Sequence, residues 1–108
     1  MSMYIVTSVH NNCDNEIEMM QPIVFETLSR AVDYIEETIN SNGFKLKSIK
    51  HSIKHYFHPE DEGSSAFFNT VSNYAEIHNY EYGQSIILKL YRAEIDLNVD
   101  VKVNLEVL

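Results

Sequence analysis

The chain has 108 residues, 44% of them hydrophobic and 22% charged, and its formal net charge is −8. This size and composition predict a single globular domain over residues 1–108. The acidic balance disfavours charge-driven binding to nucleic acid or to an anionic membrane, since both need an excess of Lys and Arg.

The lack of a recognisable targeting signal and the use of a single cysteine predict a cytoplasmic protein. No apolar run approaches the roughly 20 residues that cross a bilayer, and the opening MSMYIVTSVHNN lacks the basic region and small-residue cleavage site of a signal peptide. The single Cys13 cannot form an internal disulfide, which fits a reducing compartment.

The first predicted elements are a β-hairpin and a helix. Residues 3–9 are rich in β-branched and aromatic side chains, and an apolar pattern resumes at 17–26 after a polar turn, with Pro22 expected at an edge or a break. From Thr27 the apolar residues follow helical spacing up to a stop at Gly43. We predict a main helix over about residues 27–41, with Thr27 as its N-cap.

The segment 44–57 contains the repeat SIKHSIKH and is compatible with a helix or with a strand. Four residues are about one helical turn, and they are also two full pleats of a strand. The helix is slightly favoured because only the helix gives a purely apolar stripe. After a loop, helical spacing behind a serine cap predicts a further short helix within 64–77.

The C-terminal part is predicted to be β-structure. SIILKLY at 85–91 is nearly continuous in apolar residues, which is typical of a strand buried on both faces. From Tyr91 onward the odd positions are apolar and the even positions polar. One strand over 91–107 would exceed roughly 50 Å, so we expect a turn near residues 97–100 with an odd number of residues. The alternative is an edge strand that forms a homodimer.

These elements predict an α+β fold. An antiparallel sheet of four to five strands is expected to carry the main helix and one or two shorter helices on one face.

Three histidines are candidate metal ligands. On a helix, His51 and His55 would lie about 6 Å apart and could hold an ion together with His58 or Glu60. On a strand the same pair would lie about 13 Å apart and could not share an ion. No second Cys and no H-E-x-x-H motif is present. Solvent-facing histidines are therefore favoured and no metal is predicted, while a metal-dependent enzyme at this site is the third hypothesis.

Residues 44–58 carry four lysines and no acid. Together with nearby tyrosines they suggest a small-ligand or nucleotide-binding (sequestering) protein as the second hypothesis, although a solvated face is the more common interpretation of such a run. The candidate ligand-binding residues are Lys45, Lys47, Lys50 and Lys54. No phosphate-binding glycine motif and no nucleophile elbow is present, so neither a cofactor nor catalytic residues are predicted, and the chain is not expected to be an enzyme.

Tyrosines and acids are the predicted contacts to a partner protein. Tyrosine offers a large contact area with a polar tip, and acidic side chains suit a basic target. The predicted partner-binding residues are Tyr74, Tyr80, Tyr82, Glu94, Asp96 and Asp100.

The opening of the chain resembles small phage and prophage proteins of unknown function. In those proteins a strand hairpin ends in VF-x-T/S and runs into an A-x-x-Y-I helix, as VFET at 24–27 and AVDYI at 31–35 do here. LYRAEID at 90–96 is similar to their final strand, and these motifs carry no catalytic residue. The resemblance implies a phage-encoded protein in the host cytoplasm. The leading hypothesis is a binding module that inhibits a host protein, such as a nucleic-acid-handling or CRISPR-type defence effector.

Overall fold

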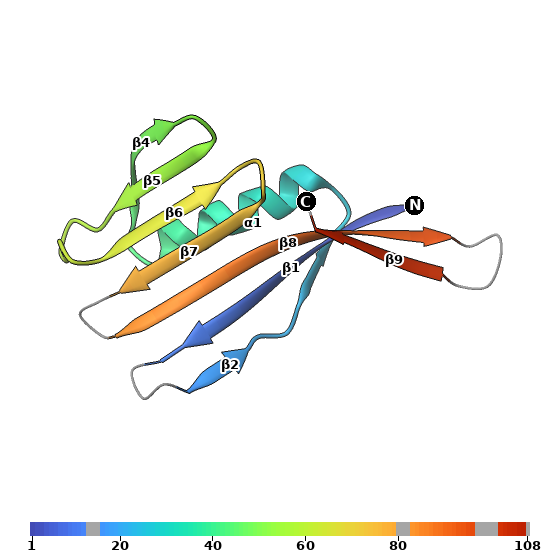
Figure 1. Cartoon of the computed structure of the whole chain (residues 1–108), viewed down its shortest axis with the longest axis horizontal. Helices are drawn as coiled ribbons and strands as arrows, with labels where there is room; N and C mark the ends of the chain where they lie inside the picture. Colours follow the sequence, from blue (N-terminus) through green and yellow to red (C-terminus); the bar gives the residue numbers. More distant parts are fainter. Residues whose placement is uncertain (13–15, 80–82, 97–101, 108) are drawn as a thin grey trace.

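The structure is a computed structural model that describes residues 1–12, 16–79, 83–96 and 102–107. Within them it shows nine strands in one antiparallel sheet and one helix, which is an α+β fold (Figure 1). The elements in chain order are β1 (Ser2–Asn11), β2 (Ile17–Met19), β3 (Ile23–Phe25), α1 (Leu28–Ser41), β4 (Lys45–Lys50), β5 (Ile53–Phe57), β6 (Ser65–Asn69), β7 (Tyr74–Asn79), β8 (Gln84–Asp96) and β9 (Lys102–Val107).

The two long strands β1 and β8 form the centre of the sheet. They pair antiparallel from Ser2 opposite Glu94 to Asn11 opposite Ser85. The short strands β2 and β3 both lie along the outer side of β1, with Pro22 in the break between them. Beyond β8 the order continues as β7, β6, β5 and β4. One edge of the sheet is therefore β2 with β3, and the opposite edge is β4 (Figure 1).

Helix α1 packs on one face of this sheet and encloses the core. Its N-cap is Thr27, whose hydroxyl oxygen accepts a hydrogen bond from the Arg30 backbone N–H at 3.2 Å. The prediction of a main helix at 27–41 is thus confirmed. Ile35 and Ile39, one turn apart, are fully buried. The sheet residues that complete the core are Val6, Tyr56, Ala66, Phe68, Ala75, Ile77, Leu88 and Leu90. Within the described part, no helix has the length and apolar character that a membrane crossing needs.

The helix favoured over residues 44–57 is wrong, because this segment is the hairpin β4–β5. His51 and Ser52 form a two-residue turn, in which His51 has a φ of 57°. β5 lies between β4 and β6, so strands on both sides satisfy its backbone. These pairings decide the structure, since a four-residue repeat suits the helical and the strand period alike.

The short helix predicted within 64–77 is also wrong, since this segment is the hairpin β6–β7. Buried residues alternate with partly exposed ones along both strands, as in a sheet. In the turn, the side-chain oxygen of Asn69 accepts hydrogen bonds from the backbone N–H groups of Val71 and Ser72. The described residues therefore hold nine strands instead of the predicted four to five, and α1 without additional helices.

The alternating C-terminal sequence forms a hairpin. β8 and β9 pair from Tyr91 opposite Val107 to Asp96 opposite Lys102. Odd-numbered residues of β8 therefore lie opposite odd-numbered residues of β9, as expected when the connection has an odd number of residues. The turn predicted at 97–100 itself lies outside the described residues. A homodimer through this edge stays a prediction.

Gly43 follows the end of α1, and we predict that Gly43→Ala destabilises the fold. Its φ is +88°, and a Cβ atom added to it would lie 2.7 Å from Nε2 of His58. That ring packs edge-on against Phe44, with the ring centroids 5.1 Å apart, so it cannot retreat without losing this contact. We expect the free energy of unfolding to fall by about 1–3 kcal/mol, as measured by urea denaturation.

Gly63→Ala is the matched control, because Gly63 has no positive φ. We expect it to change the free energy of unfolding by less than about 0.5 kcal/mol. The double variant Gly43→Ala/His58→Ala removes the ring and isolates the backbone strain. Equal stability of Gly43→Ala and the unmodified protein would contradict this explanation of the helix end.

Candidate functional site

The two faces of the sheet differ because α1 covers only one of them (Figure 1). Successive side chains of a strand point to opposite faces. On β8, Leu88 and Leu90 lie under the helix and are each 0% exposed, whereas Ile87, Lys89 and Tyr91 point to the other side. We call this other side the open face, defined by those three residues and the residues in register with them on the neighbouring strands.

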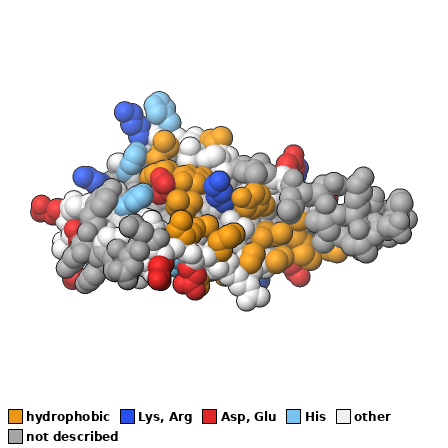
Figure 2. Space-filling model, turned by 60° about the horizontal axis from the view of Figure 1, so that its bottom comes forward, with side chains coloured by type: hydrophobic (Ala, Val, Ile, Leu, Met, Phe, Trp, Pro, Cys, Tyr) orange, Lys and Arg blue, Asp and Glu red, His pale blue; other side chains and the backbone are white. Residues whose placement is uncertain are grey.

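An apolar hollow of about 750 Å³ lies on the open face along β1 and β8. Ile5 and Val9 of β1 and Ile87 of β8 line it. Met19 of β2 and Val24 of β3 form its outer side and are 76% and 55% exposed. Figure 2 shows hydrophobic side chains gathered across the middle of the molecule, with a cationic side chain among them.

This distribution is unusual for an uncovered sheet face. An antiparallel sheet with one face in water normally directs polar side chains toward the water. The sequence predicts burial on both faces for residues 85–91. The structure does place apolar side chains on both faces of that segment, but within the described residues only one face is covered. A contiguous exposed apolar patch of this kind marks a site of interaction.

Lys89 lies among these apolar residues and lines the hollow. Its Nζ is 5.8 Å from the centroid of the Tyr74 ring, which also lines the hollow. No carboxylate in the described part of the chain forms an ion pair with Lys89. The hollow therefore combines an apolar lining with the ammonium group of Lys89. Among the described residues, this group lies near the Tyr74 ring but forms no ion pair.

A polar group borders the hollow on β7. The pKa of Tyr74 is raised to about 12, first by burial and then by the hydrogen bond to Glu76 and the negative charge of Glu76. Glu76 also reaches His78, whose Nε2 is 3.9 Å from its Oε1. Glu76 is thus already engaged by its own strand.

Of the predicted partner-binding residues whose side chains are described, Tyr74 and Glu94 lie on opposite faces of the sheet. Tyr74 lies on the open face, in register with Lys89. Glu94 is on the opposite face of β8, where it accepts a hydrogen bond from the Ser2 hydroxyl and lies 4.0 Å from the N-terminal amine. Asp96 ends β8, but its side chain is outside the described part. Residues Tyr80, Tyr82 and Asp100 lie outside the described residues altogether.

The four predicted ligand-binding lysines do not converge either. Lys45 and Lys50 share one face of β4, and Lys47 is the extra residue of a bulge. Lys54 lies on the helix-bearing side and forms an ion pair with Glu36 of α1. The basic segment is therefore distributed over the edge strand and both faces of the sheet.

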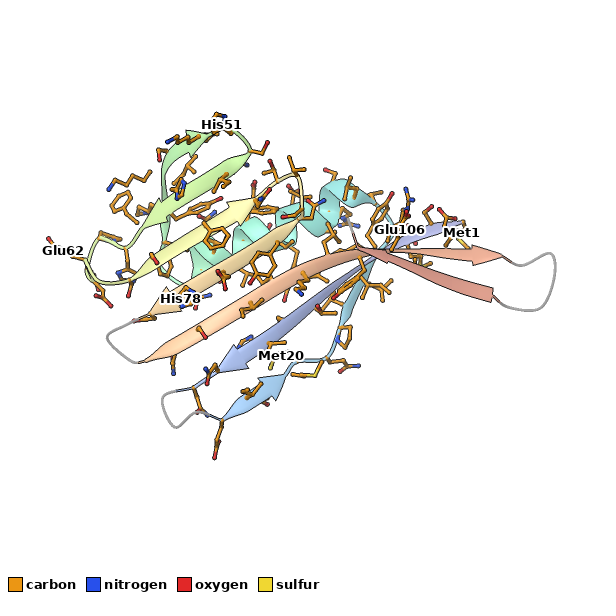
Figure 3. The ribbon with its side chains drawn as sticks, viewed as in Figure 1. Met1, Met20, His51, Glu62, His78 and Glu106 are labelled. Carbon is orange, nitrogen blue, oxygen red and sulfur yellow. The ribbon has the colours of Figure 1, made fainter. Side chains whose placement is uncertain are left out.

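The three histidines are also separated. His51 is in the turn at the tip of the β4–β5 hairpin (Figure 3), and His55 points to the open face in register with Phe67. Nδ1 of His58 accepts a hydrogen bond from the Glu60 backbone N–H at 3.2 Å. The helix on which a shared ion depended is absent, and no group of three His, Cys, Asp or Glu side chains in the described residues is arranged to hold a metal.

Sequence reasoning missed the apolar part of the open face. The sequence places its residues Met19, Val24 and Ile87 in strands but gives them no role. A signal was present, since a strand apolar on both sides was predicted in a sheet with helices on one face only. Comparison of the chain with models of protein families, with curated proteins and with solved structures gives no match in any of the three.

We predict that the ionisation of Tyr74 is displaced to high pH. Because its pKa is raised from 10 to about 12, the folded protein keeps a proton that the unfolded chain loses above pH 10. Stability should therefore fall as the pH rises from 10 through 12. Ultraviolet titration of tyrosinate in Tyr74→Phe, subtracted from that of the unmodified protein, should show one group titrating near pH 12.

The variant Glu76→Gln tests the contribution of Glu76 to the pKa of Tyr74. It removes the negative charge, so the pKa of Tyr74 should fall while remaining above 10 because burial is the largest cause. Identical titrations of Glu76→Gln and the unmodified protein would disprove the contact between Tyr74 and Glu76.

Proposed function

We propose that this protein is a binding module whose open face docks a partner protein. The observation that carries the proposal is that β8 has apolar side chains on both faces while α1 covers only one. Exposed apolar area beyond scattered single residues marks protein interfaces more often than plain surface. The open face supplies such an area at the centre of the sheet, where the backbone is held by long pairings.

The chemistry of the hollow indicates what the partner presents. Docking an apolar surface over Lys89 removes water from its ammonium group, which costs free energy unless an acceptor replaces the water. No carboxylate of the described residues forms an ion pair with Lys89, and Glu76, on the same face of β7, is hydrogen-bonded to Tyr74. The partner surface is therefore expected to present apolar side chains around an Asp or Glu that reaches Lys89.

The size of the apolar contribution suggests moderate affinity. Fully burying one Val, Leu, Ile or Met side chain contributes about 1.5–3 kcal/mol, so burying the exposed half of about five such side chains contributes about 4–8 kcal/mol. Association costs about 4–15 kcal/mol in lost freedom. Apolar contact alone would thus bind weakly, and the carboxylate at Lys89 provides the orientation and much of the specificity.

For the identity of the partner, the hypotheses drawn from the sequence are retained. A phage-encoded inhibitor of a host nucleic-acid-handling or defence protein, acting in the host cytoplasm without catalysis, stays the leading prediction. The open face supports this proposal because it offers an inhibitor a contact surface in addition to the acidic residues that the sequence predicts.

We predict that Met19→Glu weakens partner binding while leaving the fold intact. Met19 is 76% exposed, so the new carboxylate stays in water in the free protein but would be buried under a docked partner. Binding to a partner isolated from a bacterial lysate should weaken at least tenfold, which is about 1.4 kcal/mol. Isothermal titration calorimetry with the purified partner measures the change.

Val71→Glu is the matched control, because Val71 is 71% exposed in the turn between β6 and β7, away from the hollow. It introduces the same charge and should leave affinity unchanged. Equal weakening by both variants would reject the open face as the docking surface. A concentration-dependent dimer in light scattering that Met19→Glu abolishes would replace the partner protein by a second copy.

A further inference from the structure

Strand β4 is the outer strand at one end of the sheet, and its outer edge is uncovered in the described part of the chain. There it pairs only with β5, and all six of its residues are exposed. In Figure 3 this hairpin, with His51 at its tip, lies at the margin of the molecule. Backbone N–H and C=O groups on such an edge are free to pair with a further strand.

The side chains of β4 separate by chemistry between its two faces. Leu46 and Ile49 are 49% and 61% exposed and share the face of the buried Tyr56. Lys45 and Lys50 lie on the opposite face, as the register across the bulge shows. The edge therefore offers an apolar row on one side and a cationic row on the other.

The cationic row lacks counter-charges of its own. Residues 44–58 contain no Asp or Glu. Lys54 of β5 has Glu36 as its ion-pair partner, but the three lysines of β4 have no ion pair within the described residues. An acidic chain laid along β4 would supply the missing carboxylates.

A second copy of β4 does not fit this edge. Antiparallel pairing of two β4 strands would bring lysines close to lysines, which is unfavourable. The lysines and the bulge at Lys47 thus protect the edge against self-association. The same lysines attract an acidic strand. They therefore disfavour a second copy of β4 and favour an acidic partner.

A nucleotide fits less well than an extended chain. Lys45 and Lys50 are about 15 Å apart along the strand, so they cannot converge on one phosphate group. The exposed Leu46 and Ile49 would also remain uncovered by a phosphate. An extended peptide can contact the cationic row with side chains on one of its faces and the apolar row with side chains on the other.

We propose that β4 binds an acidic, extended segment of another protein as an added strand. The backbone of that segment pairs with the outer edge of β4. Its acidic side chains, at alternate positions, face Lys45 and Lys50, and its apolar side chains cover Leu46 and Ile49. This contact is separate from the open-face hollow and does not depend on it.

The test uses a short fluorescein-labelled peptide in which Glu and Val alternate, titrated with the full chain and followed by fluorescence anisotropy. Lys45→Glu/Lys50→Glu should weaken binding at least about tenfold by replacing attraction with repulsion. Arg30→Glu is the control, because Arg30 is also an exposed cation but lies on α1. It should change affinity by less than about twofold. Equal losses in both variants would overturn the proposal.

Backbone pairing is tested separately from charge. A peptide of the same sequence with alternate N-methylated amides keeps its carboxylates but cannot form a ladder, and it should bind at least about tenfold more weakly. Amide exchange of β4, measured by NMR, should slow when the unmodified peptide binds. Equal binding of both peptides, or unchanged β4 exchange, would reduce the contact to charge alone and refute the added strand.

Two further measurements separate this site from the alternatives. Met19→Glu should bind the peptide as the unmodified protein does, so loss of open-face docking leaves this result standing. ATP should displace the peptide no more than a simple salt does at the same ionic strength, because both then act only by screening charge. Specific displacement by ATP would assign the lysines to a nucleotide and overturn the proposal.

Discussion

The two-residue period of strand β8 is the constraint on which the rest of the structure depends. Its apolar residues alternate between faces, so Leu88 and Leu90 enter the core while Ile87 and Tyr91 must point away from it. β8 pairs along its length with β1 and, on its other side, with β7 and β9. A one-residue slip would exchange core and surface throughout the centre of the sheet. The same constraint thus builds the core under α1 and exposes the apolar open face.

Local signals predicted the N-terminal and C-terminal parts of the fold, and distant pairings decided the middle. Thr27 and the helical spacing after it lie within one segment, so α1 could be predicted without knowledge of any distant contact. The repeat at 48–55 suits two periods equally. Its strand form depends on β6, whose Phe67 lies opposite His55, and such a pairing cannot be read from either segment alone.

The candidate site was predictable only in part, for a related reason. Tyr74 was identified from its residue type, and it does lie at the hollow. Glu94 was predicted from its charge, but only the strand register shows that it lies on the opposite face of the sheet from Tyr74. Lys54 was assigned to a ligand, although Glu36 of α1 neutralises it across the helix-to-sheet packing. Lys89 was overlooked because its isolation is apparent only once both faces are known.

The two proposed contact surfaces share an electrostatic requirement that the net charge conceals. The chain carries −8 overall, yet the hollow around Lys89 and the edge formed by β4 each present ammonium groups without described carboxylate partners. Exposed acids such as Asp33 and Glu37 lie instead on the solvent side of α1. Copies of the chain therefore repel one another at long range, while each surface selects a carboxylate at short range. The acidic composition keeps the molecule available for a partner, and a few isolated lysines determine where that partner binds.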